Sequence, residues 1–142
     1  MGLRRDAREA AAQYLYQREM QGDESDTALT DFYDMRGLSP SRRRFCDALL
    51  QGWMRHRENV DEAIRKNALN FEFNRLSAVD RNVLRVATYE LLHCPDVPPA
   101  VAINEAIEIA KKFSTGDSGK FVNGVLDNIR KQFRASVKPS TK

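Results

Sequence analysis

The helical spacing of apolar residues is the feature that most constrains what this chain can fold into. Along most of the sequence, apolar side chains recur three or four positions apart, as on one face of an α-helix. No stretch shows the convincing alternation of apolar and polar residues that a half-buried strand requires. We therefore predict an all-α fold of about seven helices. They cover residues 4–21, about 25–35, a segment from Pro40 past Trp53, about 59–69, 77–93, 100–113, and a segment from Ser118 past Phe133.

Local signals indicate where several of these helices begin and end. Ser39 followed by Pro40 is typical of an N-cap with proline in the first turn. Ser77 with Asp80 three positions later is a capping-box pattern. Gly22 ends the first periodic segment, because glycine is the residue that most readily terminates a helix.

The length and composition predict one domain. The chain has 142 residues, of which 42% are hydrophobic and 30% charged, so it can bury a core without disulfides or metals. We expect a single unit over 1–142, with an N-terminal helical half at 1–70, a C-terminal half at 71–135 and a flexible tail at 136–142. No stretch has the apolar length of a membrane span, and the charged N-terminus does not resemble a signal peptide. We therefore expect a cytoplasmic protein.

Signatures of enzymes and metal sites are missing from the sequence. Cys46, Cys94, His56 and His93 lack the clustered spacing of a zinc site. There is no glycine-rich phosphate-binding motif, no HExxH and no GxSxG. We expect no catalysis, no metal and no cofactor. His93 lies at a predicted helix C-terminus, where we expect a partly cationic ring to interact favourably with the helix dipole.

Charge is segregated along the chain, although the net charge is only +3. Residues 22–34 contain five acids and no base, whereas residues 42–57 contain five arginines against Asp47 alone. Residues 130–142 contain five bases and no acid. This pattern favours either a polyanionic partner on the basic side or a solvated surface with a basic tail.

Three arginines, Arg4, Arg5 and Arg8, begin the first predicted helix. Positive side chains at a helix N-terminus oppose the helix dipole, so a sequence optimised for stability alone would carry acids there. A phosphate-containing partner would explain them. The alternative is that arginine is a good helix former and tolerates solvent.

A second candidate binding feature is the loop between Phe113 and Phe121, with Lys111, Lys112 and Lys120 beside it. Single-stranded RNA is held by stacking of bases on aromatic rings near basic side chains. The alternative is that both phenylalanines are core residues at helix ends.

A series of motifs in a fixed order carries a family resemblance. They are Arg5-Asp-Ala-Arg-Glu9, Gln13-Tyr-Leu-Tyr16, Leu76-Ser-Ala-Val-Asp-Arg-Asn-Val-Leu-Arg85, Tyr89-Glu-Leu91, Val97-Pro, Val101-Ala-Ile-Asn-Glu-Ala106, Ala110-Lys-Lys-Phe113 and Lys120-Phe-Val-Asn-Gly-Val-Leu-Asp127. Together they resemble the NusB family over residues 4–129.

The resemblance implies a NusB-like fold of two three-helix bundles packed across one another. It implies a non-enzymatic, cofactor-free antitermination factor that binds boxA RNA together with a ribosomal small-subunit protein, called NusE in this role. That pair is expected to join RNA polymerase and other Nus factors on ribosomal RNA operons. Homodimer formation stays open, because some such proteins self-associate through the surface that would otherwise meet RNA.

The resemblance also implies site residues. The RNA-binding positions are Arg4, Arg5, Arg8, Tyr16, Phe113, Asp117 and Phe121, and the partner-binding positions are Asp80 and Tyr16. We add Lys111, Lys112 and Lys120 on charge and proximity. Asp6 interrupts an otherwise basic N-terminus, which we expect to reduce affinity there. The cluster Arg42-Arg-Arg44 does not match the family pattern, and is either an added phosphate contact or a solvated face.

Two other functions remain as alternatives. One is a helical protein-interaction module that does not touch RNA. The other is a NusB-like accessory domain linked to ribosomal RNA modification. Binding that does not weaken with salt and does not require RNA would favour the first of these.

Overall fold

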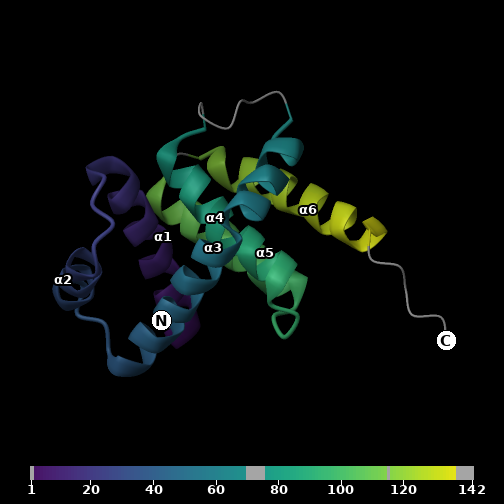
Figure 1. Ribbon diagram of the computed structural model, residues 1–142. Coiled ribbons are helices and arrows are strands. Elements are labelled where there is room, and N and C mark those ends of the chain that lie inside the picture. The colour runs from purple at the N-terminus through teal and green to yellow at the C-terminus, as the bar shows by residue number, and fades with distance from the viewer. Residues whose placement is uncertain (1, 70–75, 115, 137–142) are drawn as a thin grey trace.

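The described residues, 2–69, 76–114 and 116–136 of a computed structural model, form six α-helices and contain no strand. The helices are α1 (Leu3–Gln21), α2 (Asp26–Arg36), α3 (Pro40–Asn67), α4 (Ala78–His93), α5 (Pro99–Phe113) and α6 (Ser118–Ser136) (Figure 1). The predicted all-α class is confirmed. Residues 137–142 of the predicted flexible tail lie outside the described residues. The boundary that we predicted at residue 70 also falls outside them, so the two halves stay a prediction.

Serine caps and glycine terminators position the helix ends as the sequence predicts. The backbone N–H of Asp80 donates to the Ser77 hydroxyl at 3.1 Å, and Ser39 caps α3, which has proline in its first turn. Gly22, with φ +74°, ends α1 in the left-handed region that glycine occupies without a steric penalty.

The helix count is six in the described residues rather than the predicted seven, because the predicted third and fourth helices are one. α3 runs through Asn59 to Asn67 and contains a single residue, His56, with non-helical angles (φ −117°, ψ 18°). No glycine or proline lies between Trp53 and Asn59 to end the helix. The capping-type pattern at Asn59 therefore follows a kink and does not begin a new helix.

α4 lies at the centre of the molecule. It packs against α5 and α6 in the C-terminal group of helices, and against α1 and α3 in the N-terminal group. α1 meets this core through Ala7, Ala10 and Ala11, whose fully buried small side chains allow close approach of the helix backbones. This packing of α1 and α3 across α4–α6 agrees with the NusB-like fold that the resemblance implies (Figure 1).

α3 and α4 pack closely together at Gly52. A Cβ atom at this position would overlap the hydroxyl and ring carbons of Tyr89 on α4, so the tyrosine occupies the space that a side chain on α3 would need. Gly52 is buried. The family-like Tyr89 therefore has a packing role that depends on a glycine one helix away.

A pair of stacked histidines lies beside this contact. The rings of His56 and His93 are 3.8 Å apart with 15° between their planes, and His93 Nε2 lies 2.7 Å from Asn59 Oδ1. Burial, and then the charge of His56, lower the pKa of His93 below its ordinary value of 6.5. Our prediction of a partly cationic His93 was therefore wrong, because a neutral ring is favoured when it is half-buried against a second histidine.

The substitution Gly52→Ala tests the α3–α4 contact. We expect it to lower the free energy of unfolding by about 1–3 kcal/mol through overpacking against Tyr89. Gly124→Ala is the control, because no atom lies within 4 Å of a Cβ at that helical position. It should stabilise α6 by roughly 0.5–1 kcal/mol through better helix propensity. Urea denaturation measures both, and equal effects would contradict the packing argument.

The histidine stack predicts acid sensitivity. Because the folded-state pKa of His93 is lowered, protonation favours the unfolded chain. The contribution of His93 to stability is therefore complete above pH 6.5 and is lost as the pH falls through the lower, folded-state pKa. In His93→Gln, the unfolding free energy should fall less over this range than in the wild type. Denaturation series at several pH values measure the difference, and parallel curves would refute it.

Candidate nucleic-acid interface

One face of α1 lies along α5 and carries most of the predicted N-terminal site. Arg5, Glu9 and Tyr16 recur at helical spacing on this face. The Arg5 guanidinium donates to Glu105 Oε2, with Nε at 2.8 Å, and this hydrogen bond is the largest cause of the raised pKa of Arg5. Glu9 accepts from Lys112 Nζ at 3.0 Å. Ion pairs thus fix about one turn of α1 against about two turns of α5.

Arg8 is buried, unlike the two arginines before it. Its guanidinium donates to both carboxylate oxygens of Glu90 on α4, at 2.8 and 2.9 Å, and also approaches Glu105 at 3.4 Å. The side chains of Arg8 and Glu90 are only 4% and 1% exposed. Burial alone would lower the pKa of Arg8, but the bonds to Glu90 and the charge of Glu105 outweigh it and raise that pKa. A phosphate could reach Arg8 only by breaking this pair.

Arg4 remains at the surface. Its guanidinium lies 5.4 Å from the centre of the Phe45 ring on α3, a cation–π contact, and no carboxylate in the described part of the chain pairs with it. The N-terminal arginines therefore separate into an exposed Arg4, a half-exposed Arg5 and a buried Arg8.

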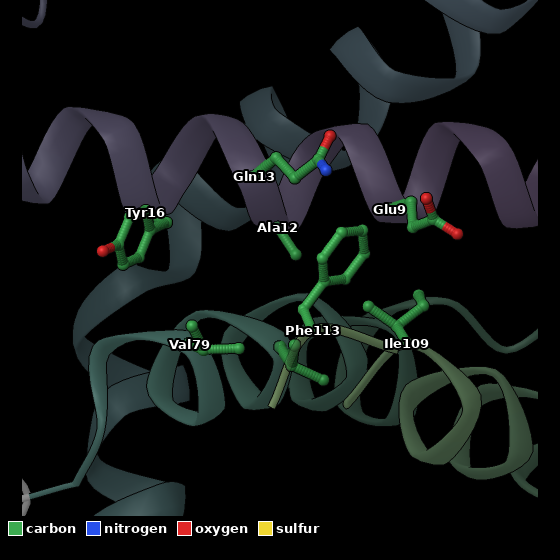
Figure 2. A pocket seen from close by; sticks show the side chains of 8 residues that line it. Glu9, Ala12, Gln13, Tyr16, Val79, Ile109 and Phe113 are labelled. Atoms are coloured by element: carbon green, nitrogen blue, oxygen red, sulfur yellow. The ribbon is translucent and has the colours of Figure 1, made fainter. Parts of the chain in front are cut away.

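An apolar groove of about 310 Å³ lies between α1, α4 and α5. Figure 2 shows Tyr16 and Phe113 along it, with Val79 below and Gln13 above. Both aromatic side chains are 39% exposed. The groove is lined by Glu9, Ala12, Gln13, Tyr16, Val79, Val83, Ile109 and Phe113. It therefore presents two partly exposed aromatic rings beside the apolar side chains of Val79, Val83 and Ile109.

The three predicted lysines differ in their ion pairs. Lys112 pairs with Glu9 and places Nζ 5.3 Å from the centre of the Phe113 ring. Lys111 pairs loosely with Glu108 at 3.6 Å. Lys120 is exposed and has no partner in the described part of the chain. All three therefore keep their ammonium groups in water near the groove or the following loop.

The remaining predicted residues lie where α4 and α6 begin. Asp80 Oδ2 accepts from the Ser118 hydroxyl at 3.1 Å, which joins the first turns of α4 and α6, while its Oδ1 is buried with no hydrogen-bond partner. Asp117 is exposed. Phe121 is half-buried and packs against the core, so only part of its ring is available for stacking.

The groove brings together Tyr16 and Phe113, which the resemblance predicts, with lining residues that we did not predict. Glu9, Gln13 and Val79 appear in the quoted motifs, but nothing in the sequence indicated that they meet Ile109. The helical spacing of Glu9 and Tyr16 on the face of Arg5 is the signal that could have identified the α1 wall.

The described residues contain no group of three or more His, Cys, Asp or Glu side chains that could hold a metal ion. Burial raises the pKa of the Cys46 thiol to about 12, so that thiol is protonated at neutral pH. Among the described residues, no helix is both long and apolar enough to span a membrane.

Comparisons with known proteins agree on one family. A sequence model of the NusB family matches residues 5–131. The transcription antitermination protein NusB of Trichlorobacter lovleyi is 47% identical over 130 residues, which cover 91% of each chain. Among solved structures, T. maritima NusB is similar with a TM-score of 0.82 at 42% identity over 91% of each chain. The antitermination factors NusB and NusE in complex with dsRNA include a chain with a TM-score of 0.84 at 28% identity, covering 93% of this chain and 98% of that one.

Arg8→Ala tests whether Arg8 holds the fold together. Because it leaves Glu90 charged and buried, we expect the unfolding free energy to drop by roughly 3–5 kcal/mol. Arg4→Ala should change it by less than about 0.5 kcal/mol. Chemical denaturation measures both.

A double variant keeps the test decisive if Arg8→Ala does not fold. Arg8→Met with Glu90→Leu replaces the ion pair by apolar side chains, and we expect it to fold with stability close to the wild type. A stable Arg8→Ala protein would show that the pair is dispensable.

Proposed function

This chain belongs to the NusB family, and we propose that it is a transcription antitermination factor that binds boxA-type single-stranded RNA together with the ribosomal protein NusE. The family match is to a transcription factor and not to an enzyme. We further propose that the RNA-bound pair joins RNA polymerase and other Nus factors during transcription of ribosomal RNA operons, in the cytoplasm.

The observation that carries the RNA proposal is the groove with two half-exposed aromatic rings beside exposed cations. Unpaired bases bind by stacking on aromatic faces, and nearby lysine and arginine side chains hold the phosphates. Tyr16 and Phe113 supply the faces, each 39% exposed. Lys112, over the Phe113 ring, supplies a cation at the same point.

The predicted residues take different roles in this proposal. Arg4 and Lys120 contact phosphates, because they are exposed and have no acidic partner in the described part of the chain. Positive charge at the edges of the groove comes from Arg5, Lys111 and Lys112. Their ion pairs with glutamates weaken the attraction of these side chains for phosphate. These contacts supply affinity without reading the base sequence.

We assign Arg8 a positioning role rather than an RNA contact. Its pair with Glu90 and its approach to Glu105 fix α1 relative to α4 and α5. The alignment of Tyr16 with Phe113 across the groove depends on that fixed position.

NusE is proposed to bind next to the RNA, at the first turns of α4 and α6. Asp80 is the partner-binding position that the resemblance implies, and its bond from Ser118 fixes the carboxylate where α4 and α6 begin.

RNA binding measured by fluorescence anisotropy tests the proposal. A boxA RNA and a scrambled RNA are compared over a salt series, with and without NusE. Tyr16→Ala and Phe113→Ala should each weaken boxA binding about 5- to 150-fold, the value of one lost base stack. Arg4→Ala should lower the salt slope by roughly 0.7, as for one lost phosphate contact.

Phe133→Ala is the matched control, because Phe133 is an equally exposed phenylalanine, at 38%, on the last helix. It should bind boxA RNA as the wild type does. Equal binding of both RNAs would contradict boxA recognition. If neither RNA bound even with NusE present, the chain would instead be a protein-interaction module.

A further inference from the structure

We propose that the outer face of α3, formed by Arg44, Ala48, Gln51 and Arg55, is a second contact surface for the RNA backbone. It would hold nucleotides that flank the boxA segment bound at the groove. This inference rests on the proposed RNA function and adds a surface to it that the family resemblance does not predict.

The three consecutive arginines at the start of α3 differ in their ion-pair partners. Arg42 Nε pairs with Asp6 of α1 at 2.8 Å, and Arg43 pairs with Asp34 of α2 at 2.6 Å. Arg44 is exposed and has no carboxylate partner in the described part of the chain. The packing of α1 and α2 on α3 therefore neutralises two of the three arginines and leaves the third in solvent.

Arg55 resembles Arg44 in its exposure and in its lack of an acidic partner. It is exposed, and no described carboxylate pairs with it. Its charge acts on the Tyr89 phenol, where it opposes the effect of burial, the largest cause of the raised pKa of that group. An uncompensated cation at this point costs little in water, but it attracts an anion that can approach the surface.

Helical geometry aligns these two arginines. Arg44, Ala48, Gln51 and Arg55 follow one another at intervals of four, three and four residues, so they share one face. All four are exposed. At 1.5 Å rise per residue, the two guanidinium groups originate roughly 16 Å apart along the helix. Ala48 and Gln51 lie between them on this face, and Asp47, which accepts from the Tyr33 hydroxyl, lies at its edge. These short side chains let a polymer lie close to the face.

Arg4, part of the proposed RNA surface of α1, contacts α3 close to the start of this face. Arg4 lies over Phe45, the residue next to Arg44. Figure 1 shows the N-terminal end of α1 beside the first half of α3. In the proposal, an RNA strand held at Arg4 passes from there to Arg44, the residue before Phe45 in α3.

The chemistry of the face favours a phosphodiester backbone over a protein. Tight protein interfaces need a desolvated aromatic or apolar centre, and this face has no apolar side chain larger than Ala48. Phosphate binding needs only well-placed cations, and the planar guanidinium of arginine suits it particularly well.

The test compares two RNAs with two charge variants. One RNA contains the boxA segment alone, and the other adds about ten flanking nucleotides on each side. Arg44→Ala with Arg55→Ala removes the proposed contacts. Arg65→Ala with Lys66→Ala is the control, since it removes the same charge from exposed positions of α3 that pair with Glu62. Thermal melts verify that all proteins fold.

We expect the Arg44/Arg55 variant to lose RNA affinity in a way that depends on RNA length. The Arg44/Arg55 variant should bind the longer RNA with a salt slope lower by about 1.4, or 0.7 per lost phosphate contact, and should bind the short RNA as the wild type does. The control variant should bind both RNAs as the wild type does.

Three results would overturn the proposal. If both variants lose affinity equally, net charge explains the effect. If the Arg44/Arg55 variant binds both RNAs normally, the face does not meet RNA. If it instead loses affinity for NusE in the absence of RNA, the face binds protein. Failure of the wild type to bind the short RNA would be a different result, because it would refute the proposed function itself.

Discussion

The buried pair of Arg8 and Glu90 holds three helices in one register. Taking a guanidinium and a carboxylate out of water is costly, and the cost is offset only while both hydrogen bonds between them are kept. Glu105 of α5 approaches the same guanidinium and also accepts from Arg5, so α5 is bound to the same point. Tyr16 and Phe113 each follow eight residues after this junction, on α1 and α5 respectively, and so meet across the groove.

Carboxylates decide which arginines belong to the fold and which remain for a ligand. Asp6 illustrates this, because we expected it to weaken an RNA-binding end, whereas it binds Arg36 and Arg42 and joins α1 to α2 and α3. The net charge of +3 does not show which arginines are paired with carboxylates and which are not. Arg4, which lies over the Phe45 ring, and Arg44, which precedes Phe45 in α3, both stay exposed.

Local signals in the sequence predicted the fold well, because helix ends depend on nearby residues. Ser77 and Gly22 act as predicted, since a cap or a left-handed glycine needs only its own turn. The extra helix at Asn59 was wrong, because a kink absorbs the change of direction within α3. The burial of Arg8 was not predictable, since its acid partner lies 82 residues away and no local pattern links the two. The apolar walls of the groove escaped prediction for the same reason.

The groove and the charges around it have different effects on ligand binding. Lys112 and Lys111 are each held by a glutamate, so the rim of the groove attracts phosphate less strongly than a row of free lysines would. A polyanion of any sequence gains little from such a rim. In the proposed binding mode, stacking on Tyr16 and Phe113 requires unpaired bases, which a duplex backbone cannot offer. The paired acids therefore favour ligands that use the apolar groove over ligands that use charge alone.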